Sequence, residues 1–200
     1  MEWRDRFPGF ETTAQWRHWD PATAGAVLGR LGPPQPIRYF TPDEHATADV
    51  LCRRLLAMDA DCPVSVVAMI DARLAEQETD GWRYEDMPED GQAWRLSLAG
   101  LKADARDRFQ APFHDLTADR CDSLIGRVRE LGSKPWHDLP AGHVWSLWTR
   151  YACTAFYSHP YAWNEIGFPG PAYPRGYKNP GVDAREPFEV EDHGENEGGS

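Results

Sequence analysis

Residues 41–58 read TPDEHATADVLCRRLLAM, and this segment carries the signals of a helix from its first residue. Thr41 can cap the helix, Pro42 suits the first helical position because its missing N–H is not needed there, and Glu44 completes a capping box. Apolar residues then recur at helical spacing: Ala48, Leu51, Leu55 and Met58. This combination predicts an amphipathic helix whose apolar face belongs to a core.

Four further segments repeat the pattern. They begin near Pro63, near Asp90, after Thr117 and after Pro140. Their apolar faces consist, in that order, of Val67, Ile70 and Leu74; of Trp94, Leu98, Leu101 and Ala105; of Cys121, Leu124, Val128 and Leu131; and of Val144, Leu147 or Trp148, Tyr151 and Ala155. Because none of the five alternates as a strand does, the chain is predicted to be all-α, a bundle of about five helices.

Two segments rich in aromatic residues flank this predicted helical domain, which is expected to span residues 37–157. Residues 1–36 form an aromatic N-terminal arm that ends in a proline cluster. Residues 158–190 contain six prolines and four glycines, so regular helix is expected to stop at Ser158 and an extended Pro/Gly/aromatic C-terminal strap to follow. Residues 191–200 are predicted to be a disordered acidic tail. Since solvated segments are typically poor in aromatic rings, the arm and the strap are each expected to pack on this domain or on a partner.

Charge and hydropathy exclude several classes of protein. The 21 basic and 32 acidic residues give a net charge of −11, which argues against a nucleic-acid partner. No apolar run approaches the roughly 20 residues of a membrane span. The N-terminus has neither a basic and apolar leader nor a twin-arginine pair, so the expected location is the cytoplasm. Export to the periplasm or cell surface is expected only together with a partner that carries the signal.

The four cysteines form no CxxC pair, so the usual zinc and redox spacings are absent. Small buried thiols are the favoured interpretation, and disulfide bonds remain the alternative. The cysteines are Cys52, Cys62, Cys121 and Cys153.

No catalytic motif is present either. The chain contains no GxSxG, HExxH, GxGxxG or Walker sequence, and His137 and His143 are six positions apart, which matches no helical metal pair. The sequence therefore predicts no catalytic, cofactor-binding or metal-binding residue in this chain.

Residues 155–177 read AFYSHPYAWNEIGFPGPAYPRGY, and this block resembles the C-terminal signature of the gluconate 2-dehydrogenase subunit 3 family. The opening at residues 39–44 and the segment from Pro63 to Leu74 are also similar to that family. The resemblance covers roughly residues 37–180, and its specific part is the block from His159 to Tyr177.

This resemblance implies an accessory subunit. In the family, a large partner of the glucose–methanol–choline oxidoreductase type holds FAD and oxidises a sugar or polyol, and a cytochrome c subunit is a further candidate partner. The small subunit is required for assembly and often supplies a twin-arginine signal, which is missing here. The resemblance thus implies a non-catalytic subunit that folds, stabilises and assembles with the flavoprotein, with FAD in the partner and no cofactor in this chain.

The strap is the candidate partner-binding segment. Prolines reduce the conformational entropy that docking removes, and Tyr, Trp and Arg dominate interface energetics. The residues proposed to bind the partner are His159, Pro160, Trp163, Asn164, Gly167, Phe168, Gly170, Tyr173, Arg175 and Tyr177. Three alternatives stay open: the rings close over the chain's own helices; His159, Asn164 and Arg175 contribute directly to a sugar-binding or oxidoreductase site; or the chain is a stand-alone binding protein.

Overall fold

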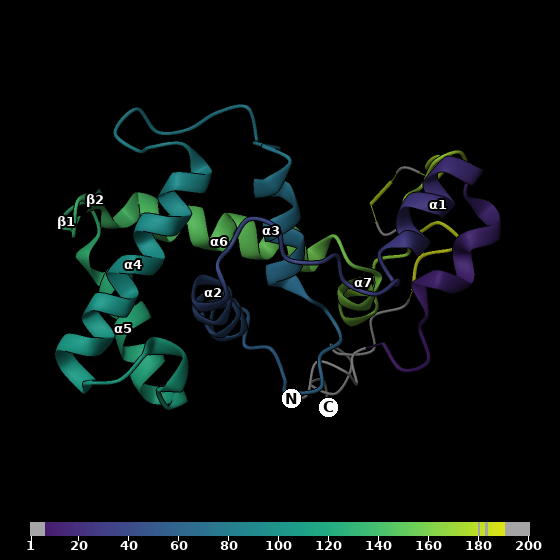
Figure 1. The fold of residues 1–200 in the computed structure, drawn as a ribbon. Helices are drawn as coiled ribbons and strands as arrows, with labels where there is room; N and C mark the ends of the chain where they lie inside the picture. The colour runs from purple at the N-terminus through teal and green to yellow at the C-terminus, as the bar shows by residue number, and fades with distance from the viewer. Residues whose placement is uncertain (1–6, 180, 183, 191–200) are drawn as a thin grey trace, which may run out of the picture. The chain divides into compact units, whose positions relative to one another are not determined.

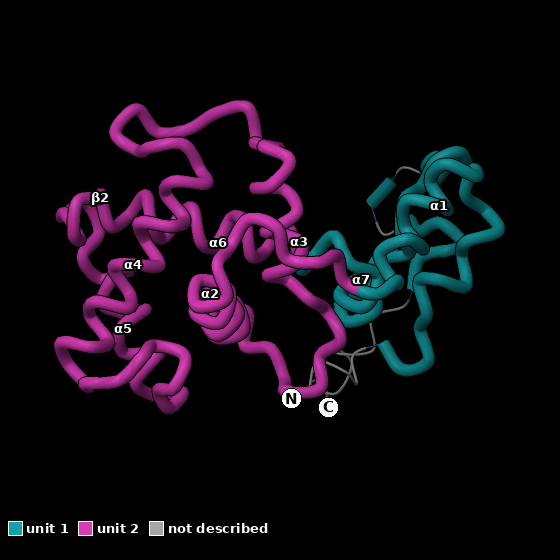
Figure 2. The backbone as a smooth tube through the Cα atoms, in the orientation of Figure 1, with its two compact units in different colours: residues 1–33, 156–200 teal, residues 34–155 magenta. Residues whose placement is uncertain are grey.

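A computed structural model describes residues 7–179, 181–182 and 184–190. The chain divides into two compact units, shown in different colours in Figure 2: unit 1 comprises residues 1–33 and 156–200, and unit 2 comprises residues 34–155. The expected N-terminal arm and C-terminal strap thus lie largely in one unit. The predicted tail, 191–200, lies outside the described residues.

The regular elements of the described chain are helices and one two-stranded hairpin (Figure 1), which confirms the all-α prediction. The elements, in order, are η2 (Thr12–His18), α1 (Pro21–Gly29), α2 (Pro42–Leu55), α3 (Val66–Ala75), α4 (Asp90–Phe109), η3 (Phe113–Asp115), α5 (Ala118–Leu131), β1 (Pro135–Trp136), β2 (Leu139–Pro140), α6 (Ala141–Tyr157) and α7 (Pro160–Ile166). The five predicted helices are α2, α3, α4, α5 and α6. No helix among the described residues is long and apolar enough to cross a membrane.

A local signal explains where α2 begins, whereas α3, α4 and α5 have no side-chain cap. The capping box at α2 is present: the Glu44 amide donates to Oγ1 of Thr41, and the Thr41 amide donates to Oε2 of Glu44 at 2.9 Å. These bonds satisfy backbone donors that a helix start leaves without a partner. The capping box that the sequence predicts at the start of this helix is therefore formed.

The core of unit 2 is built on large aromatic side chains from α4 and α6. Trp94 and Trp148 are fully buried, and the indole N–H of Trp148 donates to Oγ of Ser97 at 2.9 Å. Gly100 on α4 leaves room for the ring of Trp136 from the hairpin, which a Cβ at this position would meet at 2.8 Å. The helical faces that the periodicity identified are therefore core faces.

One buried carboxylate holds the chain segment that precedes α2. Asp71 on α3 is fully buried and accepts three backbone hydrogen bonds, at 2.7–2.9 Å, from the amides of Arg38, Tyr39 and Phe40. Three consecutive donors on one carboxylate hold this non-helical segment against α3.

Unit 1 contains two helices that the sequence analysis did not predict. Asp20 caps α1 by accepting from the amides of Ala22 and Thr23. The prediction that regular helix stops at Ser158 is wrong for residues 160–166, which form α7. The proline counted as a helix breaker, Pro160, occupies the first turn of α7, where a missing N–H has no cost.

The four cysteines form no disulfide, as the favoured interpretation required. Cys52, Cys62 and Cys121 are buried, whereas Cys153 on α6 is exposed. Burial raises the pKa of Cys121, so this thiol stays protonated at neutral pH.

Candidate partner-binding site

The ten residues proposed to bind a partner all lie in unit 1, on α7 and the segment that follows it. The structure separates nine of them into two groups, and the tenth, Arg175, belongs to neither. One group points into the unit and binds its N-terminal residues, and the other lies on the surface.

His159, Pro160 and Gly167 define α7 itself. Nδ1 of His159 accepts from the amide of Tyr161 at 3.1 Å and so caps the helix. Both His159 and Pro160 are buried, and desolvation lowers the pKa of His159 below its ordinary value, although a hydrogen bond to the backbone of Arg30 opposes this shift. Gly167 ends α7 in the left-handed conformation, at φ 66°. These three residues position the helix.

Asn164 joins α7 to the N-terminal segment. Its Oδ1 accepts from the amide of Thr12 at 2.8 Å, and its Nδ2 donates to Oε2 of Glu11 at 2.9 Å. Oγ1 of Thr12 in turn donates to the carbonyl of Phe168 at 2.7 Å. We call this set of bonds between Glu11, Thr12, Asn164 and Phe168 the clasp.

Trp163 and Gly170 pack under the clasp. Trp163 is 6% exposed and shares a small core with Trp19 and Val27, and its indole N–H donates to the carbonyl of Tyr157 at 2.6 Å. Gly170 has a φ of 79°, and a Cβ there would overlap with Cζ2 of Trp19. Only glycine fits both the backbone conformation and the space.

The second group lies on the surface. Tyr173 is 68% exposed and Tyr177 is 59% exposed, while Phe168 is partly exposed. The rings of Phe168 and Trp163 meet edge to face with centroids 5.2 Å apart. The outer face of the segment thus presents aromatic rings that the unit's own core does not use.

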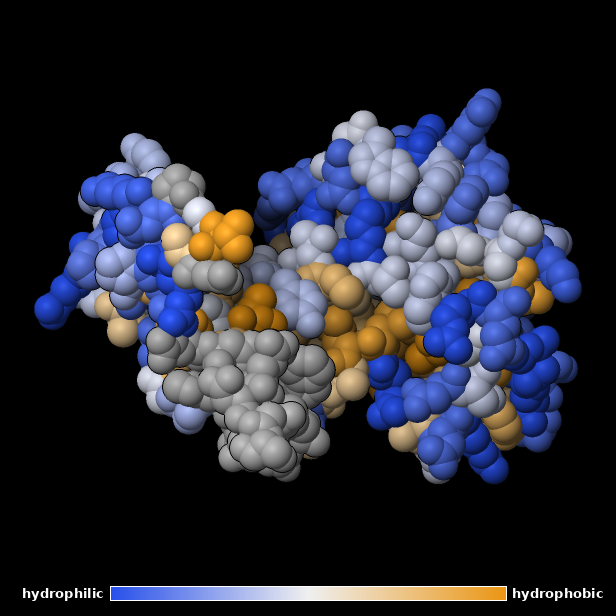
Figure 3. All heavy atoms as spheres, turned by 180° about the vertical axis from the view of Figure 1, so that it is seen from behind, coloured by the Kyte–Doolittle hydropathy of each residue, from blue (hydrophilic) through white to orange (hydrophobic). Residues whose placement is uncertain are grey.

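The sequence analysis missed several exposed apolar residues of the same unit. They are Trp16, Leu28, Leu31, Tyr157, Ile166 and Val182. Together with the three rings above, unit 1 holds nine of the thirteen exposed large hydrophobic residues of the described chain, although it has about a third of the described residues. Figure 3 shows hydrophobic atoms reaching the surface among hydrophilic ones. The aromatic character of the N-terminal arm was a signal for Trp16 alone, because Trp19 is buried and Leu28 and Leu31 are aliphatic.

Arg175 differs from both groups, because it lines a cavity of about 560 Å³ within unit 1. Its Nη1 donates to Oε1 of Gln15 at 2.9 Å, and its guanidinium carbon lies 3.9 Å from the centroid of the Phe188 ring. Lys178 and Glu186 line the same cavity.

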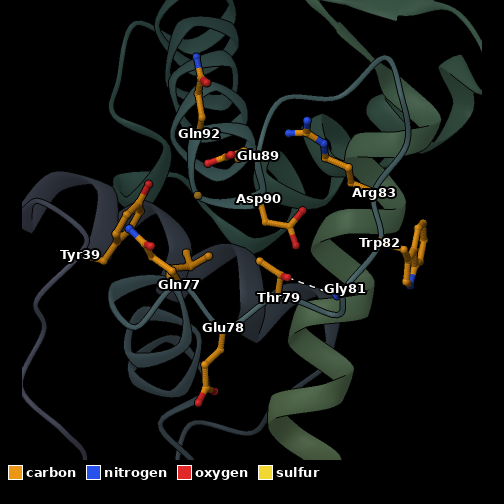
Figure 4. A pocket seen from close by; sticks show the side chains of 12 residues that line it. Tyr39, Gln77, Glu78, Thr79, Gly81, Trp82, Arg83, Glu89, Asp90 and Gln92 are labelled. Carbon is orange, nitrogen blue, oxygen red and sulfur yellow. Dashed lines mark hydrogen bonds between the residues drawn. The ribbon is translucent and has the colours of Figure 1, made fainter.

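A separate pocket of about 640 Å³ lies in unit 2, between Tyr39, the end of α3 and the start of α4 (Figure 4). Its lining mixes polar and apolar residues, and two of the polar side chains, Asp90 and Thr79, bind the chain's own residues. Asp90 accepts from the hydroxyl of Tyr151 at 2.7 Å, and burial, followed by this bond, raises the pKa of Tyr151. Figure 4 shows Thr79 turned back onto Gly81, whose amide donates to its hydroxyl at 3.2 Å.

The loop beside this pocket is held by ion pairs to two helices. Asp80 pairs with Arg73 of α3 at 2.8 Å and with Arg150 of α6. Farther along, Asp86 contacts Nδ1 of His143 at 2.8 Å, and the His143 ring stacks on Tyr84. These groups fasten the loop, and across the described residues no three His, Cys, Asp or Glu side chains are grouped to hold a metal ion.

Comparison with known proteins gives one match. The model of the family described as Gluconate 2-dehydrogenase subunit 3 matches residues 42–170, which is more than half of the chain. Neither a search of curated proteins nor a search of solved structures found a match.

Proposed function

The chain belongs to the gluconate 2-dehydrogenase subunit 3 family, and from this premise we propose that it is the non-catalytic small subunit of a FAD-dependent sugar or polyol dehydrogenase. In this role it binds the large flavoprotein subunit, stabilises it and assembles with it. The FAD and the reacting groups belong to the partner.

The observation that carries the proposal is the concentration of exposed apolar side chains in unit 1. Large exposed apolar patches typically mark interaction sites, and we infer that these side chains contribute to one. Tyr173 and Tyr177 offer large rings with a polar end, which is the chemistry enriched at interface hot spots. We therefore propose that the flavoprotein docks on the outer face of unit 1.

The inner residues support a non-catalytic role. His159 uses Nδ1 to cap α7, and Asn164 uses both ends of its amide in the clasp. Side chains engaged in this way are not placed to bind sugar hydroxyls. Of the three residues considered for direct participation in a sugar site, Arg175 lines the cavity in unit 1, whereas His159 and Asn164 line neither of the two cavities described above.

The test is co-expression of the chain with a FAD-dependent dehydrogenase subunit from the same genome. We expect a soluble 1:1 complex in which the flavoprotein retains FAD. The double variant Tyr173→Ala/Tyr177→Ala should weaken this complex at least about tenfold, because each ring removes a hot-spot contact. The control is Leu96→Ala on α4, which removes an exposed apolar side chain of unit 2 and should leave the affinity unchanged. A flavoprotein that is equally soluble, flavin-loaded and active without this chain would disprove the assembly role.

A further inference from the structure

The guanidinium of Arg175 is only partly satisfied. Nε and Nη2 are buried and have no hydrogen-bond partner among the described residues, whereas Nη1 binds Gln15. Nε and Nη2 are the two nitrogens on one side of the guanidinium, whose N–H bonds run parallel. This side is the fork that receives the two oxygens of a carboxylate.

Two buried guanidinium donors without an acceptor are unfavourable, although the arginine as a whole is only half-buried. Burial lowers the pKa of Arg175 from its ordinary value, which shows the same desolvation. Native proteins rarely leave such donors unsatisfied, and an exception commonly indicates a group that binds there. The Phe188 ring lies against the guanidinium and fixes its plane.

The obvious internal acceptor is engaged elsewhere. Glu186 lines the same cavity, but its Oε1 accepts from the amides of Lys178 and Asn179, the latter at 2.6 Å. Its Oε2 accepts from Nδ2 of Asn179 at 3.1 Å. Three bonds therefore hold this carboxylate away from the fork, and they lower the pKa of Glu186.

We propose that the cavity beside Arg175 receives the carboxylate of an aspartate or glutamate from the flavoprotein, bound side-on by Nε and Nη2. The inference rests on the proposed function and identifies one anchor of that interface. The cavity lies among the surface rings: the Tyr177 ring is 6.0 Å from that of Phe188, and Trp16 follows Gln15 in the chain. Apolar rings around a desolvated charged pair are the arrangement found at interface hot spots.

The test compares three variants of the full chain. Arg175→Met removes the charge and the fork, Arg175→Lys keeps the charge but loses the fork, and Arg108→Met removes an exposed arginine of α4 as the matched control. Each variant is assayed twice: for affinity to the flavoprotein by calorimetry, and for the thermal midpoint of the isolated chain.

We expect Arg175→Met to weaken the complex at least about thirtyfold and Arg175→Lys at least about tenfold, with Arg108→Met unchanged. The isolated Arg175→Met chain should melt at or above the wild-type temperature, because the substitution removes unsatisfied buried donors. A lower midpoint would show that Arg175 is structural and would overturn the inference.

The same measurements distinguish failure of this inference from failure of the proposed function. If the wild-type complex forms and Arg175→Met binds equally well, the inference fails and the proposed function stands. If the wild-type chain binds no flavoprotein, both fail. Acetate that binds the isolated chain with submillimolar affinity, and not Arg175→Met, would identify a free carboxylate as the occupant and overturn the assignment to a partner side chain.

Discussion

Replacing Gly170 by alanine tests how tightly unit 1 is packed. The new Cβ overlaps with the buried ring of Trp19 and lies 3.3 Å from Cγ2 of Thr12. Overpacking of this kind costs about 1–3 kcal/mol. The φ of 79° adds about 1–2 kcal/mol for any residue that carries a Cβ. We therefore expect Gly170→Ala to lower the free energy of unfolding of unit 1 by roughly 2–5 kcal/mol.

Two other glycines separate these contributions. Gly176 has a φ of 69° but open space around the position of a Cβ, so Gly176→Ala should cost only the backbone contribution, about 1–2 kcal/mol. Gly25 lies in α1 with open space and an ordinary φ. Gly25→Ala should stabilise unit 1 by about 0.5–1 kcal/mol, because alanine favours a helix.

The assay is native-state hydrogen exchange of the Trp163 indole N–H, which is bonded to the carbonyl of Tyr157 inside the unit. Each 1.4 kcal/mol lost should speed its exchange about tenfold, so Gly170→Ala should exchange roughly 30 to several thousand times faster than wild type. Equal exchange rates in Gly170→Ala and Gly176→Ala would show that the contact with Trp19 contributes nothing, and would refute the packing argument.

Three further outcomes are expected. Asp71→Ala should lower the stability of unit 2 by about 2–4 kcal/mol in urea unfolding, because it leaves three backbone donors without their acceptor; a loss below about 1 kcal/mol would contradict this. Asn164→Ala should destabilise unit 1 by about 1–3 kcal/mol and accelerate hydrogen exchange of the Thr12 amide. An unchanged exchange rate would show that the clasp does not stabilise unit 1. The pKa of His159 is lowered in the folded state, so this side chain binds a proton more readily in the unfolded chain. The stability that His159 contributes is therefore present above about pH 6.5 and is lost as the pH falls below that value. His159→Asn keeps a capping acceptor without this titration, and an unchanged pH profile in its thermal midpoint would show that another group is responsible.

The helices of unit 2 could be predicted because their signals are local. Thr41 and Glu44 lie within one turn of each other, and the apolar residues of each helix repeat every three or four positions. Such signals need no knowledge of the rest of the chain. The same rules failed at α7, where proline was counted as a breaker without regard to its position in the first turn.

The clasp could not be predicted for the opposite reason. Thr12 and Asn164 are 152 positions apart, and nothing near either residue indicates the other. In the segment from 158 to 190 there is also no sustained periodicity that would say which rings face inward. The sequence therefore proposed the residues of the candidate site as a group, but it could not separate Trp163, which is buried, from Tyr173, which is exposed.

The composition of unit 1 from both ends of the chain has a consequence for biosynthesis. Unit 2 is one continuous segment, so it can begin to fold while the ribosome is still adding residues. The N-terminal segment emerges first but must wait for residues 156–190 before it finds Asn164 and Trp163. A nascent chain can therefore form its helical bundle before unit 1, and a partner that docked on unit 1, as we propose, would bind only chains whose translation has passed the strap.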